Sequence, residues 1–265
     1  MGVKSALFNL TKSLEEVTHS SKIKVFLAYL PLALTLKLFF LPRFPLFLVR
    51  TKSGLKVPLH NLPIQDHEPW MQKYICPRKG DVCLDIGAHV GLHTIWMAKR
   101  ANLVLAIEPD SRLFRILREN VSENGLEQKV VCKNVALSDK NGSIWLYCGG
   151  LGLSTFSSKK VKLVRCEART LDRIVEEEGL SRVDWIKIDV DGSEVKVLKG
   201  AFKTVRKSKP TMVIESSFGL SLRKLTQLLH NLGYQTIIIE ETSKAESPYI
   251  LAMRKIRSRS KRDDG

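Results

Sequence analysis

The sequence predicts a doubly wound α/β fold: a mostly parallel sheet of seven strands with helices on both faces, preceded by a helical extension. From residue 82 onward, short apolar runs alternate with segments of helical periodicity, a pattern typical of βαβ units. The chain has 265 residues, of which 44% are hydrophobic, enough for one sizeable core with some peripheral structure. We therefore expect one main domain.

The first 50 residues predict a separate extension. Residues 3–18 place apolar side chains at helical spacing, which indicates an amphipathic helix. Residues 23–49 are strongly apolar, but prolines and basic residues leave only 25–36 free of charge, and a helix needs about 20 residues to cross a bilayer. Two interpretations remain open: helices that cap the domain, or an interfacial anchor that meets anionic lipid.

The remaining elements follow in order along residues 51–253, the expected catalytic domain. The predicted strands are residues 82–86, 103–107, 129–134, 183–188, 211–215, 235–240 and 249–253. The predicted helices are residues 91–99, 111–123, 171–178, 193–206 and 220–232. A hairpin around a glycine-rich and serine-rich loop is expected within residues 143–166, and residues 254–265 form a basic tail that we expect to be disordered.

Charge and cysteine content limit partners and compartment. The net charge of +16 favours contact with something anionic, such as nucleic acid, a phospholipid surface or a phosphorylated substrate. The five cysteines are odd in number and show no C-x-x-C spacing, which favours reduced thiols. No secretory signal pattern opens the chain. We expect a cytoplasmic protein, with residues 1–50 as a candidate for peripheral contact with the inner face of the membrane.

A nucleotide-type site is predicted where the first strand ends. The run from Asp85 to Gly91 follows that strand and leads into a helix. Gly87 permits a sharp turn, and Gly91 lets a ligand or the strand approach the helix start, where free backbone N–H groups favour a carboxylate or phosphate. The G-x-x-x-G spacing differs from the G-x-G-x-x-G of dinucleotide sites, which counts against NAD or FAD.

An acidic residue at the end of the second strand strengthens this prediction. Glu108 follows that strand and could accept both ribose hydroxyls of an adenosine. Alternatively, Glu108 is a surface carboxylate beside the turn at Pro109 and Asp110. The alternative role of Asp85 is to cap a helix or turn. Together, Asp85 and Glu108 favour a nucleoside ligand.

The fourth and fifth strands end in a third group of charged residues. Lys187, Asp189, Asp191 and Glu194 lie along or just after a buried strand, and Glu215 ends the next one. Because buried charges are costly unless they are paired, these groups must pair, line a wet cavity or act on a substrate. Carboxylates at neighbouring strand ends suit the deprotonation of a hydroxyl. Capping is the alternative role for Asp191 and Glu215.

Taken in order, these segments resemble the FkbM-type S-adenosylmethionine-dependent methyltransferases. The resemblance covers residues 81–215, about half of the chain. It is carried by Asp85-Ile-Gly-Ala-x-x-Gly91, Glu108-Pro109, Asn120, Asn134-Val-Ala-Leu-Ser138, Thr170-Leu-Asp172, Ile186-Lys-Ile-Asp-Val-Asp-Gly192 and Ile214-Glu215.

The resemblance implies a Rossmann-like class I methyltransferase sheet that uses S-adenosylmethionine to methylate a hydroxyl of a sugar, glycolipid or small metabolite. It implies a cofactor site made of Asp85, Gly87, His89, Gly91, Glu108, Pro109, Ala136 and Asp189. In this site Ala136 would lie near the adenine, and Asp189 would face the methionine end or the acceptor. The expected catalytic residues are Asp189, Asp191, Glu215 and Lys187. The family usually has Asn in place of His89 and Glu in place of Asp191.

Two other functions remain open at this point. The basic composition would suit an RNA methyltransferase, although the fourth strand leads into no Asn-Pro-Pro-Tyr motif and no RNA-binding module is recognisable. A non-catalytic, membrane-associated protein that keeps the fold for binding is the other alternative. His89 and His93 are four residues apart, but no third ligand follows at a recognisable spacing, so we expect no metal site. His60 and His67 flank Asp66 and Glu68 in a loop before the first strand, where a substrate-gating role and a structural role both remain open.

Overall fold

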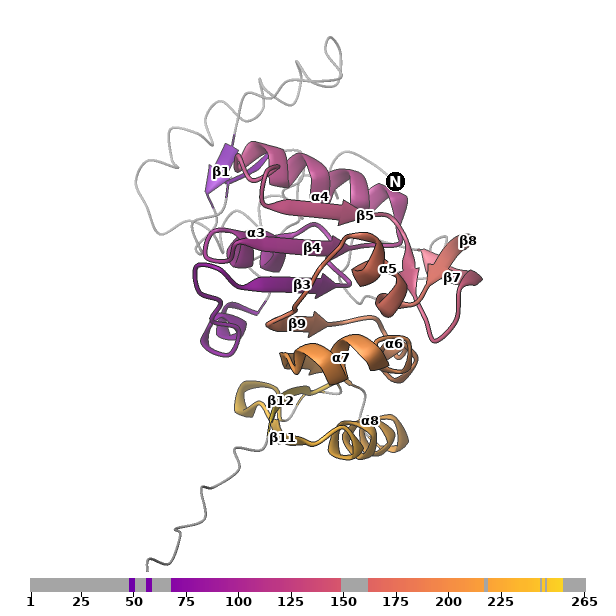
Figure 1. The fold of residues 1–265 in the computed structure, drawn as a ribbon. Coiled ribbons are helices and arrows are strands. Elements are labelled where there is room, and N and C mark those ends of the chain that lie inside the picture. The colour runs from indigo at the N-terminus through magenta and orange to yellow at the C-terminus, as the bar shows by residue number, and fades with distance from the viewer. Residues whose placement is uncertain are drawn as a thin grey trace, which may run out of the picture.

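In the computed structural model, the structure describes residues 48–50, 56–58, 68–148, 162–216, 219–243, 245 and 247–254. The main sheet has seven strands in the order β11-β12-β10-β9-β3-β4-β5 (Figure 1). β12 runs antiparallel to its neighbours β10 and β11, whereas β10, β9, β3, β4 and β5 pair in parallel. The predicted fold class, a doubly wound and mostly parallel α/β sheet, is therefore confirmed.

The elements lie close to their predicted positions. The strands of the main sheet are β3 (Val82–Ile86), β4 (Leu103–Ile107), β5 (Val130–Lys133), β9 (Trp185–Ile188), β10 (Thr211–Glu215), β11 (Tyr234–Ile238) and β12 (Tyr249–Arg254). The α-helices are α3 (Leu92–Ala98), α4 (Ser111–Glu123), α5 (Leu171–Glu177), α6 (Glu194–Gly200), α7 (Phe202–Ser208) and α8 (Leu220–Asn231), and the short 3-10 helices are η2 (Pro69–Lys73) and η3 (Glu240–Thr242).

The predicted hairpin is present but belongs to a second sheet. β7 (Gly142–Cys148) and β8 (Lys162–Arg169) pair antiparallel, and β6 (Ala136–Leu137), which the sequence analysis missed, adds in parallel to β8. This small sheet projects from the edge toward which the parallel strands point (Figure 1). A further antiparallel pair, β1 (Leu48–Arg50) and β2 (Lys56–Pro58), precedes η2.

The single helix predicted for residues 193–206 is wrong, because the chain breaks into α6 and α7 at Ala201. At Gly200, a Cβ atom would lie 2.1 Å from the Ser138 carbonyl oxygen, so the end of α6 packs directly on backbone. The Asp172 carboxylate then accepts hydrogen bonds from the backbone N–H groups of Lys203 (2.9 Å) and Thr204 (2.8 Å), in the first turn of α7. Tertiary contacts therefore override a continuous helical periodicity.

Two apolar layers enclose the sheet. One contains buried side chains of α5, α6, α7 and α8, and the other contains those of η2, α3 and α4. Because side chains alternate along a strand, Leu84 and Ile86 pack into the first layer and Cys83 into the second. The same alternation places Asp85 and Lys187 on the α3 side of the sheet.

Several predictions concern residues that the structure does not describe. The amphipathic helix 3–18, the apolar run 25–36, the glycine-rich part of the hairpin loop and the tail from residue 255 lie outside the described residues. Arg254, which we had assigned to the tail, belongs to β12. The domain boundaries stay predictions. Within the described ranges, every helix is too short or too polar to cross a bilayer.

Candidate active site

The glycine turn after β3 lies between the ends of two neighbouring strands. Gly87 has φ +76°, and a Cβ atom there would lie 1.7 Å from the Asp189 carbonyl oxygen, so no other residue fits. The N–H groups of Gly87 and Ala88 both donate to the Ile107 carbonyl oxygen at 3.0 Å. The turn is thus bonded to the end of β4 while it presses against the end of β9.

The second glycine of the run serves helix packing. Gly91 has φ +90°, and a Cβ atom would lie 2.5 Å from Cδ1 of Leu117 in α4. The side-chain amide of Asn120, also in α4, donates to the Val90 carbonyl oxygen at 2.7 Å. The absent Cβ of Gly91 thus leaves room for a helix side chain, and the expected approach of a ligand to Gly91 stays a prediction.

Glu108 connects the end of β4 to the glycine turn. Its Oε2 accepts from the backbone N–H of His89 and its Oε1 from that of Asp110, each at 2.8 Å. The residue is 6% exposed, and burial raises its pKa to about 7 in spite of these two hydrogen bonds. Each carboxylate oxygen keeps one lone pair, so Glu108 can still accept hydroxyl groups of a ligand.

The neighbouring residues of the predicted cofactor site lie on the same edge. The Asn134 side chain donates to the carbonyl oxygens of Glu108 (2.8 Å) and Pro109 (3.0 Å), which fixes the backbone where β4 ends. Ala136 is buried in β6, where it pairs with Ala168 of β8. Asn134 is one of the residues that carry the resemblance to the family, and these two hydrogen bonds give it a structural role.

Asp85 and Lys187 form a buried pair beneath this edge. Asp85 is fully buried; its Oδ2 accepts a 2.5 Å hydrogen bond from the Thr94 hydroxyl, and its Oδ1 lies 3.6 Å from Nζ of Lys187. Nζ also donates to the Gly87 carbonyl oxygen at 2.9 Å and lies 3.2 Å from Oδ2 of Asp189. Both residues lie beneath this edge, and the cofactor contact predicted for Asp85 and the catalytic role predicted for Lys187 stay predictions.

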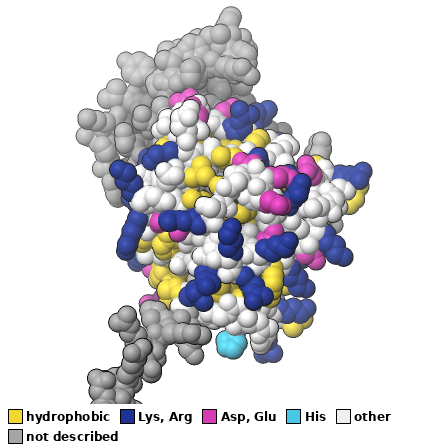
Figure 2. Space-filling model, viewed as in Figure 1, with side chains coloured by type: hydrophobic (Ala, Val, Ile, Leu, Met, Phe, Trp, Pro, Cys, Tyr) yellow, Lys and Arg dark blue, Asp and Glu magenta, His cyan; other side chains and the backbone are white. Residues whose placement is uncertain are grey.

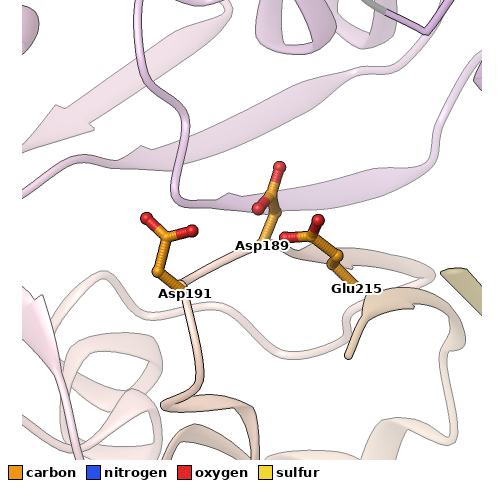
Figure 3. A group of neighbouring side chains, drawn as sticks. All are labelled: Asp189, Asp191 and Glu215. Carbon is orange, nitrogen blue, oxygen red and sulfur yellow. The ribbon is translucent and has the colours of Figure 1, made fainter. Parts of the chain in front are cut away.

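Three carboxylates face one another at the ends of β9 and β10. Asp189, Asp191 and Glu215 each place an oxygen within 4.8 Å of the others (Figure 3). We had expected no metal site, yet these three oxygens are the kind of donors that a divalent cation prefers. The sequence analysis assigned all three to catalysis, and the structure brings them together.

The protonation of this cluster is uneven. Burial opposes the charge of Asp189, but Lys187 and hydrogen bonds from Glu215 and Tyr249 outweigh burial and lower its pKa. Burial and the neighbouring Asp189 raise the pKa of Glu215 to about 9, so Glu215 holds the proton of this pair at neutral pH. Asp191 is exposed, and its pKa is raised by partial burial and by Asp189.

Residues that the sequence analysis did not assign complete the cluster. Tyr249 stands opposite Glu215 in the β10–β12 pairing, and its hydroxyl donates to Oδ2 of Asp189 at 2.9 Å. Glu68, just before η2, has a carboxylate whose charge helps to raise the pKa of Tyr249, and it lies 3.4 Å from Nε2 of His93 in α3. The sequence placed Glu68 in the loop before the first strand without a role of its own, and it carried no signal for Tyr249, because the antiparallel register brings that residue to the site.

Both positions where this chain departs from the family pattern have left-handed backbone. His89 has φ +54° and Asp191 has φ +47°. Asn, Asp and His tolerate this conformation better than most side chains, because their short polar groups bond to nearby backbone. Both replacements therefore suit the local geometry. Direct contact of His89 with the cofactor stays a prediction, as do the roles of the other predicted cofactor-binding and catalytic residues.

Comparisons with known proteins identify the family of this chain. Residues 85–236 match the family model described as methyltransferase FkbM domain. The hexuronic acid methyltransferase AglP of Haloferax volcanii is 27% identical over 164 residues, which cover 60% of this chain and 65% of that protein. The methyltransferase sdnD of Sordaria araneosa is 26% identical over 187 residues, which cover 57% of this chain and 72% of that protein.

One solved structure adds to the assignment of the fold. The crystal structure of the methyltransferase FkbM from Methylobacillus flagellatus KT superposes with a TM-score of 0.53 at 17% sequence identity. The superposition covers 91% of this chain and 57% of that chain. The sheet described here is therefore shared with a methyltransferase.

Proposed function

Because the chain belongs to the FkbM methyltransferase family, we propose that it transfers the methyl group of S-adenosylmethionine to a hydroxyl of a saccharide. The observation that carries the proposal is the meeting of Asp189, Asp191 and Glu215 beside the glycine turn. Carboxylates, which can remove a proton from a hydroxyl, therefore lie next to the glycine turn, which suits a nucleoside.

The residues around the glycine turn fit the proposed cofactor. Glu108 keeps an acceptor lone pair on each oxygen and would receive the two ribose hydroxyls. Pro109 and Ala136 lie on the same edge, next to Asn134, and would flank the adenine. When bound, S-adenosylmethionine supplies a methyl group activated by a sulfonium charge. The carboxylates of the cluster favour that positive charge at the site.

Asp191 is the best candidate for the general base. Asp189 is held ionised by Lys187 and Tyr249, which makes it a weak base, and Glu215 already carries a proton. Asp191 is exposed to an incoming acceptor, and its raised pKa improves it as a proton acceptor while it is still ionised. Asp189 and Glu215 would hold the acceptor hydroxyl in position through hydrogen bonds.

The transfer itself needs alignment and removal of one proton. The cofactor would supply an electrophilic methyl carbon with sulfur as the leaving group, and the acceptor hydroxyl would be the nucleophile. Asp191 would take the hydroxyl proton and later return it to water. No covalent bond to the protein forms, so the protein contributes positioning and charge.

A saccharide acceptor is supported by the relative from Haloferax volcanii, which is named a hexuronic acid methyltransferase. The exposed side chain of Trp145 in β7 also offers an aromatic surface on the sheet that projects from the same edge. Both points support the proposal without identifying the sugar.

Substitution of Asp191 tests the proposal. The protein is incubated with S-adenosylmethionine labelled in the methyl group and with uronic-acid oligosaccharides, and label in the saccharide is counted. Asp191→Asn should lower kcat by about 10²-fold or more, whereas Asp191→Glu should keep most activity. Calorimetry with S-adenosylmethionine should give similar affinities for all three forms. Full activity in Asp191→Asn would refute the role of Asp191 as the base. Failure of the wild type to bind the cofactor or to label any saccharide would refute this function.

A further inference from the structure

A groove between α6 and α8 lies outside the site described above. Its volume is about 410 Å³, within the range of small-molecule sites. It is lined by Val195, Lys199, Arg223, Lys224, Gln227, Leu228 and Asn231. No carboxylate is among these residues, so the groove carries positive charge without a compensating acid of its own.

The cations of the groove lack partners within the described part of the chain. Lys199, Arg223 and Lys224 are exposed, and none of them pairs with a described carboxylate. By contrast, Lys133 pairs with Glu178, and Arg173 with Glu177. Figure 2 shows other Lys and Arg side chains over the same helical face. Repulsion among these cations favours an external anion.

The groove also offers groups that suit a sugar. Val195 and Leu228 are half-buried and provide apolar surface for the C–H groups of a pyranose ring. The Gln227 amide donates to Oδ1 of Asn231 at 3.0 Å, so the two side chains form one polar unit with both donors and acceptors. The Arg223 guanidinium can bind a carboxylate through two parallel hydrogen bonds.

The groove begins at the same edge of the sheet as the carboxylate cluster but on the other face. Val195 and Leu228 pack against the layer of α5 to α8, whereas Tyr249, which bonds to Asp189, packs into the layer of η2, α3 and α4. α6 starts at Glu194, three residues after Asp191, and Val195 lies in its first turn. α8 follows β10, the strand that ends at Glu215, and its groove residues run to its last residue, Asn231. With a rise of about 1.5 Å per residue, the positions from Arg223 to Asn231 extend along about 12 Å of helix, the length of two to three sugar units.

We propose that this groove binds the acidic saccharide chain of the methyl acceptor, with uronate carboxylates against Lys199, Arg223 and Lys224. The inference rests on the proposed function and names its substrate class. The sugar whose hydroxyl is methylated lies at the carboxylate cluster, and the units beyond it pass around the strand ends into the groove on the other face. An acidic saccharide thus binds through the cations of the groove, whereas the proton is removed by the carboxylate cluster. The groove therefore determines the affinity for the acceptor and the cluster determines the rate of transfer.

Direct binding to the full-length protein tests the inference. Calorimetry compares tetragalacturonic acid with the neutral maltotetraose. The groove variant is Lys199→Ala/Arg223→Ala/Lys224→Ala. The matched control, Lys79→Ala/Arg115→Ala/Arg118→Ala, removes three exposed cations from other surfaces and changes the net charge equally. Circular dichroism checks that both variants are folded, and S-adenosylmethionine is titrated into each protein separately.

We expect the wild type to bind the acidic tetrasaccharide more tightly than the neutral one. The groove variant should lose about tenfold in that affinity and the control about twofold or less, with cofactor affinity unchanged in both. The inference is overturned if the wild type does not bind the acidic saccharide, or if both variants lose equally. It is also overturned if a short single-stranded RNA displaces the saccharide and depends on the same three cations.

Failure of the proposed function would look different. A wild-type protein that binds the acidic saccharide through the groove but not S-adenosylmethionine would contradict methyl transfer while it upholds the groove. Suppose instead that every variant binds the cofactor normally and methylates acidic and neutral saccharides equally well. That result would uphold methyl transfer and contradict the groove.

Discussion

The β3–β4 half of the catalytic edge and the β9–β10 half treat their carboxylates in different ways. In the first half, both oxygens of Glu108 accept backbone N–H groups, and the turn around Gly87 is held by backbone hydrogen bonds. In the second half, Asp189, Asp191 and Glu215 crowd within 4.8 Å, with the buried ammonium of Lys187 as their nearest cation. One half is organised by backbone geometry and the other by balance of charge.

The difference indicates where substitutions act. Changes in the β3–β4 half should disturb backbone packing and cofactor affinity, because its polar groups already have fixed partners. Changes in the β9–β10 half should move protons, because removing one charge there alters the pKa of the others. Four predictions, ordered by expected effect, test this division.

Lys187→Met should have the largest effect on stability. Lys187 is 3% exposed and lies between Asp85 and Asp189, so its loss leaves two carboxylates without their cation. We expect the free energy of unfolding to fall by about 4 kcal/mol at neutral pH, measured by urea denaturation. Lys187 lowers the pKa of Asp189 in the wild type, so this pKa rises in the folded variant. The deficit should therefore shrink as the pH falls below it, and a deficit that is independent of pH would contradict the role of charge.

Gly87→Ala should be nearly as disruptive for a reason that involves no charge. Its Cβ atom would overlap the Asp189 carbonyl oxygen, and its φ of +76° strains any side chain. The expected loss is about 3 kcal/mol, independent of pH. Gly125→Ala is the matched control, since Gly125 has φ +65° with no neighbour within 4 Å, and should cost about 1 kcal/mol. Equal losses in the two variants would argue against the close approach of β3 and β9.

Tyr249→Phe should have an intermediate effect. Phe keeps the edge-to-face contact with Trp70, whose ring centroid lies 5.1 Å away, but removes the hydrogen bond to Asp189. We expect a loss of about 2 kcal/mol, because the lost hydrogen bond is buried and has a charged acceptor. The control Tyr74→Phe removes a hydrogen bond to Glu241 at the surface and should change stability far less. Similar losses in both would show that the cluster does not depend on Tyr249.

The smallest expected effect is on cofactor affinity as a function of pH. Burial raises the pKa of Glu108 to about 7, and its ionised form is the better acceptor for ribose hydroxyls. Affinity for S-adenosylmethionine should therefore increase about tenfold between about pH 6 and pH 8, as the ionised fraction rises. Calorimetry with Glu108→Gln should show weaker binding and no such trend. If the affinity of the wild type did not change with pH, a group other than Glu108 would bind the ribose hydroxyls.

The sequence was most informative where a local pattern sufficed. The alternation of apolar runs and helical segments located all seven strands of the main sheet, and the strand–glycine turn–helix pattern located Gly87 and Glu108. It failed at Ala201, where packing of Gly200 on Ser138 and the capping of α7 by Asp172 divide a continuous helical pattern. Those contacts join residues that lie far apart in the chain.

The sequence by itself determined the order of strands and helices and the carboxylates that end them, because periodicity and strand ends are properties of consecutive residues. Only the tertiary structure decided which of those groups share a proton, which are buried, and that Tyr249 and Glu68 join them. Protonation and burial depend on distances between strands. At the acidic end of the site these are set by the parallel pairing of β9 with β10 and by the antiparallel pairing of β12 with β10.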